Sequence, residues 1–192
     1  MHCRRRIQRL SCVLLLAVTF LIGSCSRGAE TPQKKGSNIL FEFSSPAFVN
    51  GAALPGKYTC YGENVSPPLK WSGIPEGTKS LALICQDPGA PKGSRVLWMV
   101  YSIPPSIMEL PEGIQAIGIL SNGAKQGRND FNEFGYKGPC PPEGKITRSI
   151  FKLYALDHAP KFPPGISEKE FISIVEGHHL AEKQLMVTCQ KE

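Results

Sequence analysis

The 192-residue chain lacks the sequence signatures of the common catalytic and metal-binding classes. Its seven cysteines include no C-x-x-C pair, so zinc-ribbon and thioredoxin chemistry are unsupported. No serine lies in a nucleophile-elbow context. The stretch from Gly138 to Lys145 fails as a phosphate loop, because five residues separate its glycines and three prolines remove amide donors.

Few histidines are present, and their order in the sequence gives no metal site. His178 and His179 are adjacent, which makes a poor chelate, and the sequence places no third ligand beside them. No Ser-His-Asp arrangement can be assembled from the available motifs. We therefore predict a protein that is not an enzyme, binds no metal and needs no cofactor.

Outside residues 1–24, the chain also lacks a strong net charge of either sign. The formal net charge is +6, from 22 basic and 16 acidic residues. Residues 1–24 hold four of the arginines and no acidic residue, so the remainder has 18 basic against 16 acidic side chains. A domain so nearly balanced, without a dense stripe of lysine and arginine, is not expected to bind nucleic acid.

No apolar run reaches the length of a transmembrane helix. The stretch 12–22 follows a cluster of arginines and is shorter than the roughly 20 residues that a spanning helix needs. This order predicts an export signal over residues 1–24. The small residues before Cys25 resemble a lipobox, which favours lipidation of Cys25 over ordinary secretion. Residues 25–37 would then tether a folded domain, residues 38–192, to a periplasm-facing membrane of the cell envelope.

Four cysteines would remain in this oxidising compartment, where disulfides persist. They are Cys60, Cys85, Cys140 and Cys189, and three sets of pairings are open to them. A Cys60–Cys140 disulfide is the expected one, because both residues lie in proline-rich loops that flank predicted strands. Cys85 lies within an apolar run and is expected to be a buried thiol.

Glycine and proline are abundant, with 19 and 17 residues, and their clusters divide the chain into short segments. Strands are predicted at 39–44, 80–85, 96–103, 114–120, 149–156 and 185–189, from alternating or continuous apolar runs. Ser167 and Glu170 form a capping box that predicts one helix, which we expect to continue or restart as far as Leu180. The pattern predicts a mainly β fold, an antiparallel β-sandwich with a short helix late in the chain.

Several unusual segments follow one another in a fixed order. They include Asn64-Val65-Ser66-Pro67-Pro68, Asp87-Pro88-Gly89-Ala90-Pro91, Gly127-Arg128-Asn129-Asp130-Phe131, Gly135-Tyr136-Lys137-Gly138-Pro139-Cys140-Pro141-Pro142 and Gly177-His178-His179-Leu180-Ala181. Together they resemble the phosphatidylethanolamine-binding protein family, in its bacterial Raf-kinase-inhibitor-like branch, over roughly residues 38–190. The resemblance implies two antiparallel sheets with Greek-key connections and a small rim pocket for anions and phosphorylated head groups.

The resemblance places that pocket at a set of loop and strand residues. They are Asp87, Pro88, Pro91, Leu97, Gly138, Pro141 and Arg148. The chain departs from the family pattern here, since Leu97 stands where the strand histidine is expected. Thr147 and Ser149 stand where a histidine and a tyrosine would flank Arg148. We therefore expect a pocket that keeps its shape but has weaker or altered affinity for anions.

Two arginines leave open whether the pocket still binds anions. Arg95 and Arg148 are permanent cations that could in part replace the lost histidines toward phosphate. Alternatively, Arg148 could form a structural ion pair with Asp87.

The resemblance thus implies a non-enzymatic, membrane-anchored binding protein for a small anionic ligand or phospholipid head group. The alternative is a protein-interaction module that inhibits a kinase or a protease, since family members include both. Bacterial members often form dimers, so a homodimer is a further expectation.

Overall fold

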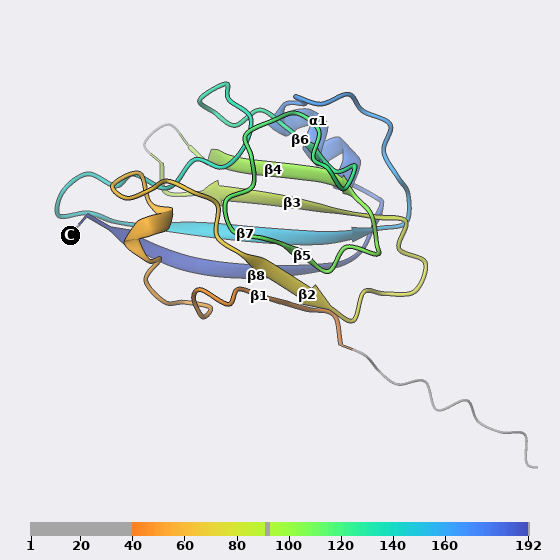
Figure 1. The fold of residues 1–192 in the computed structure, drawn as a ribbon, viewed down its shortest axis with the longest axis horizontal. Helices are drawn as coiled ribbons and strands as arrows, with labels where there is room; N and C mark the ends of the chain where they lie inside the picture. Colours follow the sequence, from red (N-terminus) through yellow and green to blue (C-terminus); the bar gives the residue numbers. More distant parts are fainter. Residues whose placement is uncertain (1–39, 91–92, 192) are drawn as a thin grey trace, which may run out of the picture. The chain divides into compact units, whose positions relative to one another are not determined.

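The described strands lie in two antiparallel sheets (Figure 1). The computed structural model describes residues 40–90 and 93–191, so the predicted signal and tether, Cys25 and Pro91 lie outside the described residues. The smaller sheet has the order β1-β2-β5 and the larger one β6-β4-β3-β7-β8. In chain order the elements are β1 (Glu42–Ser44), the 3-10 turn η1 (Gly56–Tyr58), β2 (Leu69–Ser72), β3 (Ser80–Asp87), β4 (Arg95–Ile103), β5 (Glu109–Leu110), β6 (Lys125–Gln126), β7 (Ile146–Leu156), α1 (Glu168–Val175) and β8 (His179–Gln190). The predicted β-sandwich with a short late helix is confirmed.

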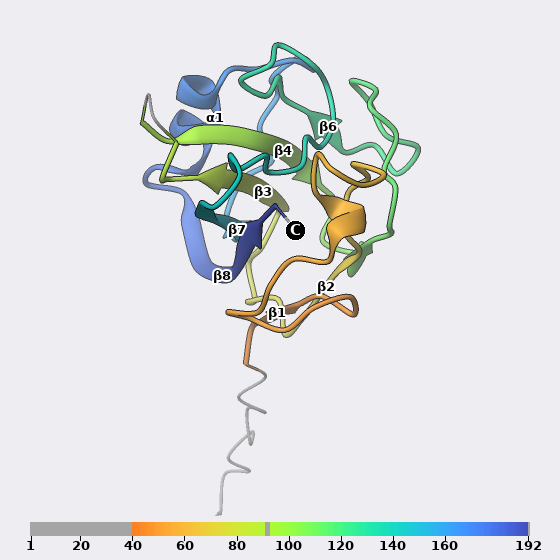
Figure 2. The same ribbon diagram turned by 90° about the vertical axis from the view of Figure 1, so that its left-hand side faces the viewer.

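Strand β3 is buried on both faces, which explains its continuous apolar sequence. Leu81, Leu83 and Cys85 belong to the core between the two sheets. Ala82 and Ile84 belong to a second cluster, together with side chains of α1 (Figure 2). The large sheet is therefore the middle layer of the domain.

Helix α1 begins as predicted but ends earlier than predicted. The Ser167 side chain accepts from the Glu170 amide, and the Glu170 carboxylate accepts from the Ser167 amide, which completes the capping box. The expected extension to Leu180 is wrong. Gly177 adopts a left-handed φ of 73°, which stops the helix, and the following residues enter β8.

The strand expected at 114–120 does not form, so this prediction is also wrong. Carbonyl groups of the segment accept hydrogen bonds from a side chain instead of from a neighbouring strand. The Gln126 amide donates to the Gln115 and Ile117 carbonyl oxygens, both at 2.7 Å. Within this segment only Ile119 forms a β-bridge, to Lys125. The buried Gln126 thus replaces a neighbouring strand as the hydrogen-bonding partner.

The long strand β8 lies at one edge of the large sheet and has a second chain segment beside it. The Gly51 amide donates to the Met186 carbonyl at 2.7 Å, and the Leu54 amide donates to the Thr188 carbonyl at 2.8 Å. These bonds cover part of an edge that would otherwise be open to other strands. Across the described ranges, no helix has the length and apolar character needed to cross a membrane.

The register of the large sheet decides which side chains meet at its two ends. Gln86 of β3 pairs with Ile150 of β7, so Asp87 and Ser149 reach the same end of the sheet. At the other end Leu156 pairs with His179. The β7 strand therefore connects two separate clusters of polar side chains.

Candidate functional site

Asp87 ends β3 and lies almost completely buried, with 6% of its surface exposed. Its Oδ1 atom accepts a hydrogen bond of 2.9 Å from the Gly89 amide. This bond closes a tight turn around Pro88, as aspartate commonly does at the start of a loop. The carboxylate is thus fixed at the end of the strand.

Thr147 and Ser149 of β7 place two hydroxyl groups at the same end of the sheet. By strand alternation they share the inner face with Phe151, which belongs to the core between the sheets. Both hydroxyl oxygens are buried and have no hydrogen-bond partner among the residues that the structure describes. An unpaired buried hydroxyl costs about 1–3 kcal/mol, so these groups favour a polar ligand or water as their partner.

An open groove of about 520 Å³ joins the two segments. It is lined by Pro88, Gly89, Ile146, Thr147 and Arg148. Its volume lies within the range of small-molecule sites. The groove is thus bounded by the turn after β3 and by the first residues of β7.

Arg148 supplies the positive charge of the groove. Its side chain is exposed, and within residues 40–90 and 93–191 it forms no salt bridge, to Asp87 or to any other carboxylate. Arg95 is engaged elsewhere, since its guanidinium lies 5.6 Å from the Phe131 ring centroid. Arg148 is therefore a cation in the groove lining that is available to a ligand.

Two buried thiols lie near Asp87 and are expected to be unreactive. Burial, with a smaller contribution from the Asp87 carboxylate, raises the pKa of Cys189 to about 11. The same two causes raise the pKa of Cys85 well above its ordinary value. Because the thiolate is the reactive form, neither cysteine is suited to nucleophilic chemistry at neutral pH.

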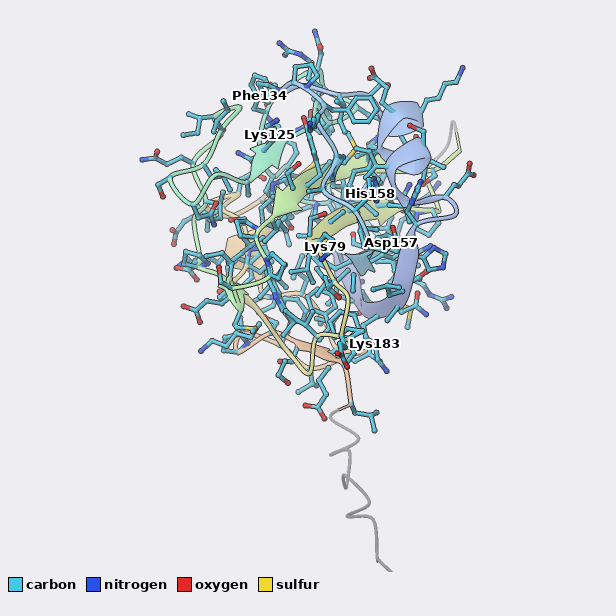
Figure 3. The ribbon with its side chains drawn as sticks, turned by 90° about the vertical axis from the view of Figure 1, so that its right-hand side faces the viewer. Lys79, Lys125, Phe134, Asp157, His158 and Lys183 are labelled. Carbon is cyan, nitrogen blue, oxygen red and sulfur yellow. A yellow bond between two sulfur atoms is a disulfide. The ribbon has the colours of Figure 1, made fainter. Side chains whose placement is uncertain are left out.

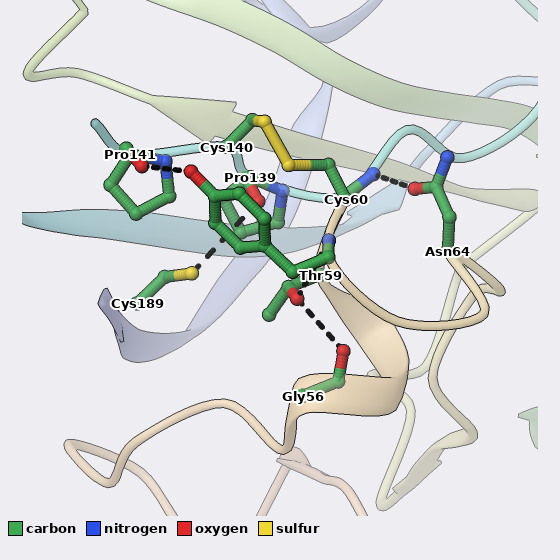
Figure 4. Close-up of a disulfide and its surroundings, with 10 residues drawn as sticks. Gly56, Thr59, Cys60, Asn64, Pro139, Cys140, Pro141 and Cys189 are labelled. Atoms are coloured by element: carbon green, nitrogen blue, oxygen red, sulfur yellow. Dashed lines mark hydrogen bonds between the residues drawn. A yellow bond between two sulfur atoms is a disulfide. The ribbon is translucent and has the colours of Figure 1, made fainter. Parts of the chain in front are cut away.

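Gly138 and Pro141 do not line the groove. Pro141 lies in the neighbouring loop, next to the disulfide that Figure 4 shows. The Gly138 amide donates to the Asn64 side chain at 2.7 Å, and the Tyr61 hydroxyl donates to the Pro141 carbonyl. Between them, Cys140 forms a disulfide with Cys60, with Cα atoms 5.3 Å apart. The proline-rich loop is thus held to the segment after η1.

Leu97 also lies outside the lining of the groove. It has 2% of its surface exposed and packs in the core between the sheets. Its carbonyl accepts a hydrogen bond of 2.9 Å from the Lys137 amide. Of the residues predicted for the pocket, Pro88 and Arg148 line the groove, and Asp87 lies buried next to Pro88 without lining it.

Thr147 and Ser149 were not among the predicted ligand-binding residues, although the sequence marked their positions. The resemblance places a histidine and a tyrosine at these two positions. The hydroxyls that replace them in this chain were not predicted to bind a ligand. Only the fold shows that both hydroxyls are buried and unpaired.

The described histidines lie far from this groove. His158 follows the C-terminal end of β7, whereas Thr147 lies at its start, and about 3.3 Å per residue separates them by roughly 30 Å. The lining of the groove therefore carries the Thr147 hydroxyl and the Arg148 guanidinium, and no described histidine belongs to it. The fold and site define a two-sheet β protein with a small polar groove at the strand ends.

The comparisons with known proteins identify the family. The sequence profile described as "Phosphatidylethanolamine-binding protein" matches residues 44–190. A "UPF0098 protein" of Methanothermobacter thermautotrophicus is 46% identical over 140 residues, covering 73% of this chain and 92% of that protein. The chain belongs to the phosphatidylethanolamine-binding protein family.

Two solved structures agree with this assignment. A putative phosphatidylethanolamine-binding protein homolog from Chlamydia trachomatis is 36% identical, with a TM-score of 0.73, and the match covers 80% of this chain and 99% of that one. E. coli YbcL, described as a member of the mammalian family, is 32% identical with a TM-score of 0.73, and the match covers 79% and 99%.

Proposed function

We propose that this chain is a non-enzymatic binding protein of the cell envelope whose groove takes a small ligand with an anionic or phosphorylated group. The observation that carries this proposal is the buried, unpaired hydroxyl of Thr147, which lines the groove together with the exposed Arg148. Hydroxyl donors and a permanent cation are the groups that recognise phosphate oxygens when histidine is missing.

The position of Asp87 favours a ligand that also carries a positive charge. A carboxylate next to a groove opposes a simple anion, but it can pair with an ammonium group. A zwitterion such as phosphoethanolamine would place its phosphate toward Arg148 and its ammonium toward Asp87. Inorganic phosphate and acetate lack the ammonium and are expected to bind more weakly.

The membrane location is supported by the sequence. An arginine-rich segment, a short apolar run and small residues before Cys25 are the parts of a lipoprotein signal. A lipid anchor would hold the domain close to phospholipid head groups, which raises their local concentration at the groove.

Calorimetric titration of the chain with phosphoethanolamine, phosphate and acetate tests the ligand. Replacing Arg148 with Ala removes a charge-assisted hydrogen bond and should weaken phosphoethanolamine binding by about tenfold or more. Lys152→Ala is the matched control, because Lys152 lies on the same face of β7 outside the groove. Its affinity should equal that of the unmodified chain.

A second variant tests the hydroxyl directly. Thr147→Val removes an unpaired buried oxygen, so it should not destabilise the free protein, yet it should weaken ligand binding. Equal affinity in the Arg148→Ala variant and the unmodified chain would contradict the proposal, as would the absence of binding to all three compounds.

A further inference from the structure

A second polar cluster lies at the opposite end of β7, where the chain returns into β8. Asp157 and His158 follow β7, and His178 immediately precedes β8. The Asp157 amide donates to the His178 carbonyl at 3.0 Å, which brings the two segments together. Figure 3 shows Asp157 and His158 side by side at this end of the sheet.

Three potential metal ligands converge in this cluster. The His178 Nδ1 atom lies 3.1 Å from Asp157 Oδ1, and the His158 Nδ1 atom lies 3.6 Å from the same oxygen. The two imidazole rings have centroids 4.1 Å apart, and their planes are tilted by 43° to each other. All three ligand atoms lie within 4.8 Å of one another.

The two distances to Asp157 Oδ1 are close to those between ligands of one small cation. Zinc bonds of about 2.0–2.2 Å at tetrahedral angles place ligand atoms about 3.3–3.6 Å apart. The 3.1 Å distance to Asp157 Oδ1 lies just below this interval, and the 3.6 Å distance lies at its upper end. The shorter distance is also that of a hydrogen bond, whereas the longer one exceeds hydrogen-bonding range.

His158 provides an independent observation. Its Nδ1 atom is buried and has no hydrogen-bond partner among the residues that the structure describes. A buried polar nitrogen without a partner is unfavourable, and a metal ion coordinated there would satisfy it. The atom faces the carboxylate of Asp157, which is the position that a shared cation requires.

The main chain holds these ligands in place before any metal binds. The His158 carbonyl accepts from the Ser80 hydroxyl at 2.7 Å, and the His178 amide donates to the Val175 carbonyl at 3.1 Å. Ligands that are already positioned lose little conformational entropy on binding.

We propose that Asp157, His158 and His178 form a binding site for one divalent first-row transition metal, with zinc as the reference ion. Two imidazole nitrogens and one carboxylate oxygen are ligands that suit this class of metal better than calcium or magnesium. Three protein ligands leave one tetrahedral position for water or for a group from another molecule.

The fold also explains why the sequence did not predict this site. His178 and His179 are adjacent in sequence, but His179 is not part of the cluster. Its Nδ1 atom lies 3.3 Å from the Val175 carbonyl, and its ring packs edge-on against Tyr154. The partner of His178 is instead His158, twenty residues earlier, which the β7–β8 pairing brings beside it.

Zinc competition against a chromophoric chelator tests the proposal, with the full chain in detergent solution. Replacing His158 or His178 with Ala should remove one equivalent of bound zinc or weaken it by more than about tenfold. Asp157→Asn should weaken it as well. His179→Ala is the matched control and should bind zinc like the unmodified chain.

The design separates this site from other zinc ligands and from misfolding. The cysteines of the N-terminal segment are present in every variant, so their contribution cancels in the comparison. Thermal unfolding without metal should be similar for all variants, whereas added zinc should raise the Tm only when the three ligands are intact. Equal zinc binding by all variants would overturn the proposal, and so would an equal loss in His179→Ala.

Discussion

At the residue scale, the residues that line the groove are only in part those that the family pattern predicts. Pro88 and Arg148 of the groove, and Asp87 next to it, could be placed from sequence, because prolines and a strand-end aspartate keep their order along the chain. The burial of the Thr147 and Ser149 hydroxyls could not, since it depends on pairing between β7 and its neighbours. Sequence identifies which residues can bind, and strand register decides which of them meet.

Glu112 carries a prediction about pH at this scale. Its carboxylate accepts from Lys57 and from the Tyr58 hydroxyl, each at 2.6 Å. The hydrogen bond from Lys57, and next that from Tyr58, lower the pKa of Glu112 below its ordinary value of 4.5. A group with a lowered folded pKa stabilises the protein above its unfolded pKa and loses that contribution as pH falls through the folded value.

We therefore expect Glu112→Gln to be less stable than the unmodified chain above pH 4.5, with a difference that shrinks as the pH falls below that value. Urea unfolding at a series of pH values measures this difference. Glu109→Gln is the control, because the Glu109–Lys70 pair is exposed and 3.4 Å apart. A difference between Glu112→Gln and the unmodified chain that grows in acid would contradict the assignment.

At the element scale, sequence was most informative where a local rule dominates. The capping box located the start of α1, and the apolar runs located β3, β4 and most of β7. The short strands β2, β5 and β6 were missed, because two to four residues carry too little periodicity. The exposed first half of β8 was missed since no buried face imposes alternation there.

The disulfide gives a prediction at this scale, because it joins two loops that are 80 residues apart in sequence. Closing a loop of that length restricts the unfolded chain and contributes about 4–5 kcal/mol. We expect the double replacement of Cys60 and Cys140 by Ser to lower the free energy of unfolding by that amount in urea titrations.

Reduction of the unmodified chain provides the control for this variant. Cys85 and Cys189 are already free thiols, so a reductant changes only the Cys60–Cys140 bond among the described cysteines. The reduced chain and the double variant should unfold at the same urea concentration. A reduced chain as stable as the oxidised one would show that the loop closure contributes nothing.

At the scale of the whole molecule, the large sheet organises two sites through one strand. The inner core and the layer beneath α1 cover both of its faces, so its strand ends are where polar side chains can gather. One end of β7 contributes to the groove and the other to the histidine cluster. Since roughly 30 Å separates them, the two sites can be altered independently, and their variants should not affect each other's ligand.

The proposed anchor predicts how the whole chain is processed in a bacterial cell. If Cys25 is the first residue of the mature protein and carries acyl chains, the N-terminal peptide should show both the cleavage and the added mass in mass spectrometry. Each buried methylene adds about 0.8 kcal/mol to membrane binding, so such a protein should remain with the membrane fraction. Cys25→Ala should lose the acyl mass, whereas replacing Cys3 and Cys12 should leave it unchanged, because both precede the cleavage point. A mature chain that begins elsewhere and carries no acyl group would contradict the anchor while leaving the groove and its ligand to be judged by the titrations.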